Sequence, residues 1–196
     1  MEEMDKRKIA MDFVSPLGGA VPIDEKSLDL KDATNRHYYE DTAFRAKLNA
    51  TFKPTEIKAK NYQIIYFTGG HGTMWDFPEN AQIQAITRQI YENDGMVAAV
   101  CHGVAGLLNT KLSDGSYLID KKRITGFSNW EEKIVGLEDE VPFLLQDKLI
   151  ERGAEYHKAI LPFVRYIKVD ERLVTGQNPQ SVRKVGKKVI EEMFDK

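Results

Sequence analysis

The chain has 196 residues with 42% hydrophobic and 30% charged side chains, which is typical of a soluble globular protein, and we predict one domain over residues 1–196. Its net charge of −2 gives no electrostatic reason to expect nucleic acid or an anionic membrane surface as a partner. No apolar stretch approaches the ~20 residues of a membrane span, and the lone cysteine cannot form an internal disulfide, so we expect a cytoplasmic protein.

The first half of the chain shows two strand patterns and two helix patterns. In chain order we predict a strand over residues 8–14, a helix over residues 35–49, a strand over residues 62–67 and a helix over residues 78–93. Clusters of turn-forming residues follow both strands, at residues 15–19 and 69–72. The segment between residues 20 and 31 has no regular pattern.

The second half begins with five apolar residues, 96–100, which predict a strand buried on both faces. A short helix from residue 104, a hairpin near residues 113–115, a strand over residues 123–127, a helix over residues 141–152, strands over residues 166–169 and 173–175, and a helix over residues 181–194 follow. This alternation predicts an α/β fold with a mostly parallel sheet and helices on both faces. In such folds, ligands bind beyond the carboxyl ends of the strands.

Cys101 is the only cysteine, and it follows the buried strand directly. Small residues stand two positions before it and two positions after it, at Ala99 and Gly103. A strand, a tight turn and a helix with this spacing are typical of a nucleophile elbow. A helix N-terminus and an imidazole beside the thiol would favour the thiolate. The alternative is that Cys101 is a small buried hydrophobic residue.

Three other residues are candidates for further chemistry. His102 is either a hydrogen-bonded histidine at a helix start or a general base that needs a carboxylate to orient its ring. Glu131 and Glu132 are either solvated residues in the first turn of a helix or the source of that carboxylate. The residues alone leave both questions open.

The glycine-rich loop after the second strand is the other candidate segment. It is either an ordinary turn or a source of backbone N–H groups for an oxyanion hole. His71 lies in this loop, but the histidines and the cysteine show no standard zinc spacing, so we expect no metal. Trp75 and Trp130 lie close in sequence to the candidate residues, and they are either core residues or walls of a pocket.

Three motifs in the expected order resemble the ThiJ/PfpI superfamily, which is flavodoxin-like and belongs to the class I glutamine-amidotransferase-like group. They are residues 68–78 (TGGHGTMWDFP), residues 99–103 (AVCHG) and residues 124–127 (ITGF). Residues 15–24 (SPLGGAVPID) also resemble a loop in the branch that holds heat-shock chaperones with glyoxalase III activity. The resemblance extends from about Ile9 onwards and implies a flavodoxin-like three-layer sandwich.

The resemblance implies specific roles. Cys101 would be the nucleophile, His102 its general base and Glu132 the acidic third member, with the backbone N–H groups of Gly70 and His102 as the oxyanion hole. His71, Trp75 and Trp130 would line the pocket. The reaction would convert methylglyoxal, a small aldehyde, into lactate without a cofactor, and the protein would form a homodimer. The resemblance leaves two other activities open, namely a stress-response holdase chaperone for unfolded client proteins and a cysteine peptidase or amidase.

One part of the family pattern has no counterpart in this chain. Members of the family begin with a strand and a helix ahead of the segment that starts here at Lys8, and the turn between them supplies a glutamate that hydrogen-bonds the cysteine. We therefore expect the sheet to be completed differently, either by pairing with another chain or by residues 9–14.

Overall fold

The computed structural model describes residues 1–195, and of Lys26 it describes the backbone alone. The chain divides into two compact units, Met1–Ile57 and the residues from Lys58 on. The single domain predicted over residues 1–196 stays a prediction. Within residues 1–195, no helix combines the length and the apolar character that crossing a membrane requires.

The first unit is made of short helices: α1 (Glu2–Lys6), the 3-10 turn η1 (Glu25–Ser27), α2 (Ala33–Glu40), α3 (Thr42–Asn49) and the 3-10 turn η2 (Pro54–Glu56). The predicted strand over residues 8–14 is wrong. Only Val14 finds a strand partner, through an isolated parallel bridge to Phe52. The predicted helix over residues 35–49 is divided in two, because Asp41 adopts an extended backbone and its side chain accepts a hydrogen bond from the Phe44 N–H at the start of α3.

The second unit contains a four-stranded sheet in the order β1 (Ile64–Phe67), β2 (Met96–Val100), β6 (Leu173–Gly176) and β5 (Ile167–Asp170). The first three strands run parallel, and β5 pairs with β6 in the antiparallel direction. Strand β2 lies in the middle of the sheet, and all five of its residues are buried, as its unbroken apolar sequence predicts. Strand β1 is at one edge, and residues 9–13 add no strand to it.

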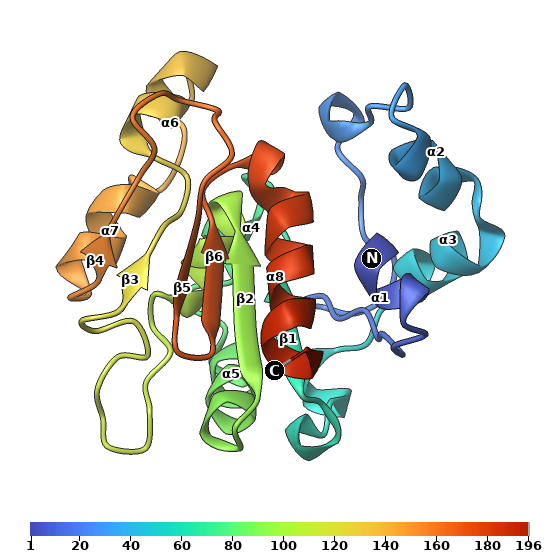
Figure 1. Ribbon diagram of the computed structural model, residues 1–196, viewed down its shortest axis with the longest axis horizontal. Coiled ribbons are helices and arrows are strands. Elements are labelled where there is room, and N and C mark those ends of the chain that lie inside the picture. Colours follow the sequence, from blue (N-terminus) through green and yellow to red (C-terminus); the bar gives the residue numbers. More distant parts are fainter. Residues whose placement is uncertain (196) are drawn as a thin grey trace. The chain divides into compact units, whose positions relative to one another are not determined.

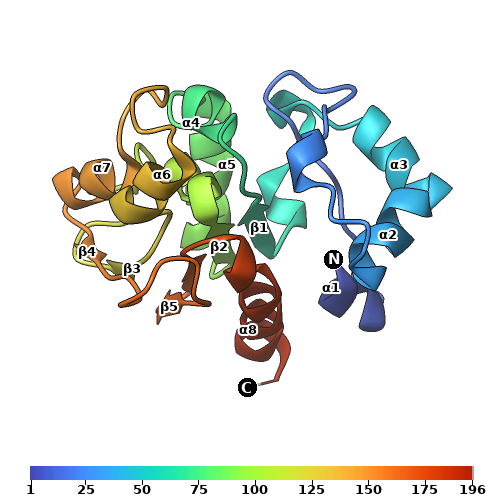
Figure 2. The same cartoon turned by 90° about the horizontal axis from the view of Figure 1, so that it is seen from above.

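Helices cover both faces of this sheet (Figures 1 and 2). Helix α5 (Ala81–Glu92) packs against β1 and β2, and α8 (Val182–Phe194) packs against β2 and β6 from the other side. The apolar residues of α8 repeat at helical spacing, so that Val185, Val189 and Ile190 are buried against the strands. The predicted fold class, a mostly parallel α/β sandwich, is therefore confirmed.

The remaining elements are short: η3 (Ala59–Asn61), α4 (Thr73–Asp76), η4 (Cys101–Leu107), β3 (Arg123–Ile124), α6 (Asn129–Val135), α7 (Leu145–Glu151), β4 (Glu155–Tyr156) and η5 (Pro179–Ser181). Strands β3 and β4 form a separate parallel pair.

The predicted hairpin is present as a bridge between Lys111 and Tyr117. Helix α5 begins later than predicted because the Asn80 side chain accepts the N–H groups of its first turn. The helix predicted to begin after Cys101 is a 3-10 helix, not an α-helix.

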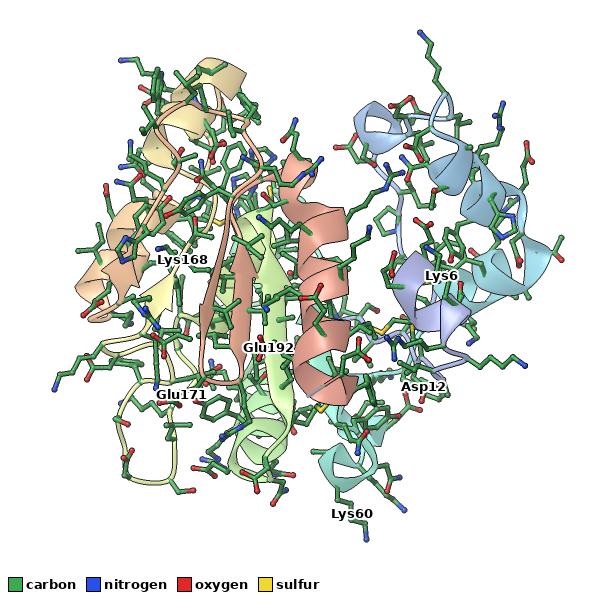
Figure 3. The ribbon with its side chains drawn as sticks, in the orientation of Figure 1. Lys6, Asp12, Lys60, Lys168, Glu171 and Glu192 are labelled. Carbon is green, nitrogen blue, oxygen red and sulfur yellow. The ribbon has the colours of Figure 1, made fainter. Side chains whose placement is uncertain are left out.

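The parallel strands bring two sequence motifs to one end of the sheet. The glycine-rich loop follows β1, and Cys101 follows β2, so both leave the carboxyl ends of neighbouring parallel strands. The β5–β6 turn at Glu171 lies at the opposite end (Figure 3). The candidate site is thus built where ligands of parallel α/β sheets usually bind.

Candidate active site

The backbone at Cys101 has the strained geometry of a tight strand-to-helix turn. Its φ angle is +57°, in the left-handed region that costs energy for a residue with a side chain. Gly103 is required by the turn, because a Cβ atom there would lie 2.1 Å from the Thr68 carbonyl oxygen. A Cβ atom at Gly69 would lie 3.0 Å from the Cys101 Cβ atom. The small residues around Cys101 therefore let the two loops approach closely.

Cys101, His102 and Glu132 lie in one hydrogen-bonded line. The Cys101 Sγ atom is 3.4 Å from His102 Nδ1, and His102 Nε2 is 2.6 Å from Glu132 Oε2. The His102 and Glu132 side chains are almost fully buried. With Nε2–H donating to the carboxylate, the Nδ1 lone pair faces the thiol, and His102 is placed to accept the Cys101 proton.

A second histidine, His71, forms a hydrogen bond to the other carboxylate oxygen of Glu132. His71 Nε2 lies 2.8 Å from Glu132 Oε1, and the His71 ring packs against the His102 ring at a tilt of 38°, with 3.9 Å between centroids. The His71 side chain is 32% exposed, so it is the member of this cluster that reaches solvent. The sequence placed His71 in the pocket, but nothing in it indicated the bond to Glu132, which depends on how α6 meets the loop after β1.

The hydrogen bonds set the charges of this cluster. Burial alone would raise the pKa of Glu132, but the hydrogen bonds from His102 and His71 outweigh it and lower that pKa to about 2. Burial lowers the pKa of His102 below its ordinary value, against the opposing effect of its bond to Glu132, and the nearby His71 adds to the lowering. At neutral pH the cluster therefore holds a carboxylate and a neutral His102 able to act as a base.

The protonation state of Cys101 differs from the expectation drawn from the sequence. Burial raises the pKa of the Cys101 thiol to about 12, although the backbone N–H groups of His102 and Gly70 donate toward the sulfur and oppose the effect. The side chain is 6% exposed, and Glu131 and Glu132 also disfavour a thiolate beside them. The resting form is the thiol, and its proton must leave as the sulfur attacks.

This state predicts the pH dependence of Cys101 alkylation. Iodoacetamide should modify the folded protein slowly at about pH 7, at a rate still rising above about pH 9, because thiolate forms there only at high pH. The unfolded protein is the control, since its thiol should titrate near the free value of ~8.5. As Cys101 is the only cysteine, the amount of carboxamidomethyl-cysteine formed reports this site alone. A rate that has already reached its plateau at neutral pH would contradict the assignment.

Glu131 has a different role from Glu132. It is completely buried and accepts four hydrogen bonds, from the Ser128 N–H and hydroxyl, the Phe163 N–H and the Asn178 side-chain amide. Ser128 and Glu131 also form the capping box at the start of α6. Of the two glutamates that the sequence left open, Glu132 faces His102 and Glu131 anchors the helix that carries it.

Replacing Glu131 by glutamine should therefore destabilise the protein by about 3 kcal/mol, because an amide nitrogen would face donors that a carboxylate oxygen now accepts. Urea unfolding measures the loss. Glu138→Gln, at an exposed position beyond α6, is the matched control and should leave the free energy of unfolding unchanged. Equal stability of the two variants would show that the buried hydrogen bonds of Glu131 do not hold α6.

Of three aromatic residues close in sequence to the candidate motifs, Tyr66 interacts with Cys101. Trp75 on α4 is 55% exposed and Trp130 on α6 is 44% exposed, and their place in a pocket stays a prediction. Sequence reasoning missed Tyr66 on β1. Its hydroxyl is buried and has no hydrogen-bond partner among the described residues, and burial and the nearby Cys101 raise its pKa. A buried hydroxyl in this state is available to bond a small ligand.

The same cluster contains side chains that could bind a metal ion. His71, His102 and Glu132 offer ligand atoms that all lie within 4.8 Å of one another, which makes them a candidate among the described residues. Those atoms are already joined by the two hydrogen bonds to Glu132, and an ion would have to replace both. The expectation of no metal stays a prediction.

Comparison with known proteins gives consistent matches over most of the chain. The model of the DJ-1/PfpI family matches residues 25–192. "Glutathione-independent glyoxalase HSP31" of Saccharomyces cerevisiae is 36% identical over 200 residues, which cover 96% of this chain and 83% of that protein. "Glyoxalase 3" of Candida albicans is 36% identical over 157 residues, which cover 76% of this chain and 66% of that protein.

Solved structures match with similar quality. Rapid Encystment Protein 24 KDa of Francisella tularensis has a TM-score of 0.90 at 43% identity, covering 93% of this chain and 81% of that one. Glyoxalase III from Candida albicans has a TM-score of 0.91 at 28% identity, covering all of this chain and 85% of that one.

Proposed function

The chain belongs to the DJ-1/PfpI family, and from this premise we propose that it is a glutathione-independent glyoxalase, a cysteine enzyme that converts methylglyoxal-like 2-oxoaldehydes to 2-hydroxy acids. The names of its relatives support an enzyme of this kind. The observation that carries the proposal is the line from Cys101 through His102 to Glu132, with two backbone N–H groups directed at the sulfur. The proposal includes one domain, a homodimer and a cytoplasmic location.

The first step forms a carbon–sulfur bond. The Cys101 sulfur attacks the aldehyde carbon while its proton passes to His102 Nδ1, 3.4 Å away. The aldehyde oxygen becomes an oxyanion, which the N–H groups of Gly70 and His102 are placed to stabilise. Glu132 stabilises the His102 imidazolium that forms transiently in this step. His102 then returns the proton to the oxygen, which gives a neutral hemithioacetal and a neutral base.

The later steps move hydrogen between the two carbons. His102 removes the hydrogen of the former aldehyde carbon as a proton, which gives an enediolate, and it returns this proton to the adjacent carbon. The hydroxyl proton of the former aldehyde oxygen passes to the former ketone oxygen in the same rearrangement. The former aldehyde carbon is oxidised to a thioester, and the former ketone carbon is reduced to a carbinol. Water then cleaves the carbon–sulfur bond, which releases the 2-hydroxy acid and restores the thiol. The sum is one 2-oxoaldehyde and one water converted to one 2-hydroxy acid, so no cofactor is consumed.

The test is methylglyoxal consumption in buffer without glutathione, with the product measured in the same samples. One lactate should form for each methylglyoxal consumed, and a lyase of the D-lactate type should give a single enantiomer. Consumption without lactate would instead indicate stoichiometric trapping of the aldehyde by side chains. That outcome would overturn the proposal.

A second candidate function has its own supporting observation. Six exposed apolar side chains lie on α6 and on residues 157–165: Trp130, Ile134, Val135, Ile160, Leu161 and Val164. The two segments are in contact, because the Phe163 N–H bonds to Glu131 and the Lys158 ammonium lies over the Trp130 ring. Ile160 is 92% exposed. An apolar surface of this kind is typical of a site that binds other proteins, here unfolded clients of a holdase chaperone.

Suppression of client aggregation separates the two functions. If the apolar residues bind unfolded clients, Ile160→Asp with Leu161→Asp should abolish suppression, and Cys101→Ala should leave it unchanged. Both side chains are exposed, so these changes should not disturb the fold. Full suppression by the double variant would exclude this surface as the client site.

A further inference from the structure

We propose that Tyr66 binds the substrate, with its hydroxyl donating a hydrogen bond to the ketone oxygen of a bound 2-oxoaldehyde. The inference rests on the proposed glyoxalase function and deepens it, because it names the group that recognises the second of two adjacent carbonyls. Tyr66 lies on β1, the strand that leads into the glycine-rich loop of the site. The attack by Cys101 and the proton transfers by His102 leave its hydroxyl unused.

The Tyr66 hydroxyl lacks the partner that a buried polar group normally has. It is buried, and no group of residues 1–195 is hydrogen-bonded to it. By contrast, the hydroxyls of Tyr91 and Tyr156 both donate to acceptors of the protein at 2.8 Å. Burial of a hydroxyl without a partner costs free energy. A ligand oxygen that completes this hydrogen bond explains why the hydroxyl is left open.

The strand register places Tyr66 close to the nucleophile. Tyr66 pairs with Ala98 of β2, three residues before Cys101. Gly69 follows three residues after Tyr66 and lies against the cysteine, since a Cβ atom at Gly69 would be 3.7 Å from Cys101 Sγ. Burial and then the nearby Cys101 raise the pKa of the Tyr66 hydroxyl above its ordinary value of 10, and the second effect requires the two groups to lie within electrostatic range.

The second oxygen of the substrate is the one that needs a donor. The backbone N–H groups of Gly70 and His102 are directed at the sulfur and serve the oxygen of the aldehyde carbon. Removal of the proton from that carbon shifts negative charge onto the former ketone oxygen, where a fixed donor stabilises it. Because its pKa is raised, Tyr66 keeps its proton at neutral pH and acts as this donor without transferring the proton. The contact therefore favours substrates with two adjacent carbonyls.

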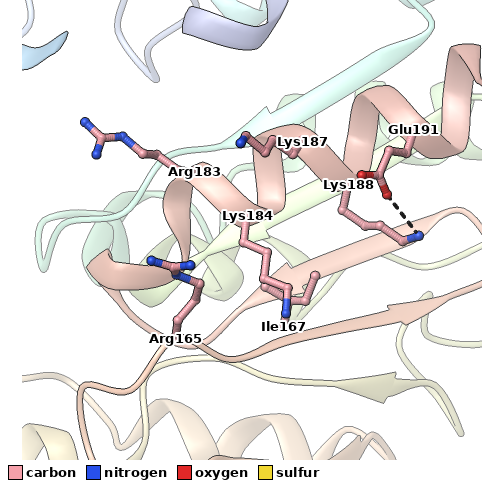
Figure 4. Close-up of a pocket in the computed structure, with 7 residues that line it drawn as sticks. All are labelled: Arg165, Ile167, Arg183, Lys184, Lys187, Lys188 and Glu191. Carbon is pink, nitrogen blue, oxygen red and sulfur yellow. Dashed lines mark hydrogen bonds and ion pairs between the residues drawn. The ribbon is translucent and has the colours of Figure 1, made fainter.

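The cation-rich groove between β5 and α8 is a separate feature of the surface (Figure 4). Ile167, Lys184 and Lys187 are among the residues that line it, and the lining includes neither Tyr66 nor Cys101. A substrate molecule held there would not touch the nucleophile. Lys184 is exposed, so Lys184→Gln serves as a control for the effect of surface charge on turnover.

Tyr66→Phe is the test, because it removes the hydroxyl and keeps the ring. We expect kcat/KM for methylglyoxal, measured as lactate formation, to fall by about 10²-fold, as when a donor to an oxyanion is removed. The loss should lie in kcat more than in KM, since charge develops on the ketone oxygen only as the proton leaves the carbon. The urea midpoint should equal or exceed that of the wild type, because the variant loses an unsatisfied buried group.

Tyr91→Phe is the matched control. It removes a tyrosine hydroxyl that donates to Glu171, in the β5–β6 turn at the end of the sheet opposite Cys101. The variant should therefore lower the urea midpoint while kcat/KM stays at the wild-type value. Lys184→Gln should change neither quantity.

The outcomes separate this inference from the proposed function. Wild-type protein that consumes methylglyoxal without forming lactate would overturn both. Wild-type protein that forms lactate, together with Tyr66→Phe at the same kcat/KM, would overturn the role of Tyr66 alone. A fall in kcat/KM of Tyr66→Phe together with a lower urea midpoint would assign the hydroxyl a structural role and would also overturn the inference.

Discussion

Cys101→Ser should abolish methylglyoxal consumption while the protein remains folded. The serine oxygen is a much weaker nucleophile than sulfur, and this position has no second thiol nearby to replace it, because Cys101 is the only cysteine. We expect turnover to fall by about 10³-fold or more. The steady-state rate of lactate formation measures the effect. Cys101→Ala should give the same loss, which excludes a residual role for the serine hydroxyl.

The control for this prediction is stability. Cys101 is held at φ +57° by its surroundings, and serine fits the same space, so thermal unfolding of Cys101→Ser should match that of the wild type. A folded Cys101→Ser protein that still forms lactate at the wild-type rate would remove Cys101 from the reaction. The holdase function would then be better supported than the glyoxalase function.

Glu132→Gln should have the second largest effect, a fall in kcat of about 10²- to 10⁴-fold. Glu132 accepts hydrogen bonds from both His102 and His71. Glutamine keeps one acceptor oxygen, but its amide nitrogen must face the other ring nitrogen, which is also a donor. One histidine is then forced into the other tautomer or away from the site. Glu138→Gln is the control on an exposed position and should retain full activity.

The pH profile distinguishes this role from a structural one. Activity needs neutral His102, so it should fall as the pH drops through the pKa of His102, which burial holds below its ordinary value of 6.5. The bond to Glu132 raises the pKa of His102, and its removal should move the acid limb of the remaining activity to lower pH. An acid limb that moves to higher pH, or does not move, would show that Glu132 does not stabilise the imidazolium.

Glu132 also links stability to pH. Its folded-state pKa is about 2, below the ordinary value of 4.5, so its contribution to stability is complete above about pH 4.5. That contribution is lost as the pH falls through the folded-state value. The wild type should therefore lose more stability than Glu132→Gln does between about pH 5 and pH 2.

The sequence predicted the central part of the fold because that part depends on local pattern. The five apolar residues of β2 are typical of a short buried strand, and the apolar spacing of α8 matches one helix face. The strand predicted over residues 8–14 was wrong, and the helix predicted over residues 35–49 lacked the break at Asp41. A strand needs a partner that the pattern alone does not provide, and Asp41 ends one helix and begins the next.

The candidate site was predictable in its residues but not in its electrostatics. The order strand, cysteine, histidine placed Cys101 and His102 together, and the resemblance to a family selected Glu132. His71 and His102 each form a hydrogen bond to one oxygen of Glu132. This arrangement depends on how α6 packs against the loops that follow β1 and β2. The raised pKa of Cys101 arises from desolvation, which follows burial in the folded protein and has no signature in the sequence.

The central claim is that the Cys101 sulfur forms a bond to the substrate during turnover. Acid quenching during the first turnover with methylglyoxal, followed by mass analysis of the Cys101 peptide, tests it most directly. We predict an adduct on that peptide which appears and decays at the rate of turnover and is absent from Cys101→Ser. A Cys101 peptide that stays unmodified while lactate forms would contradict the account.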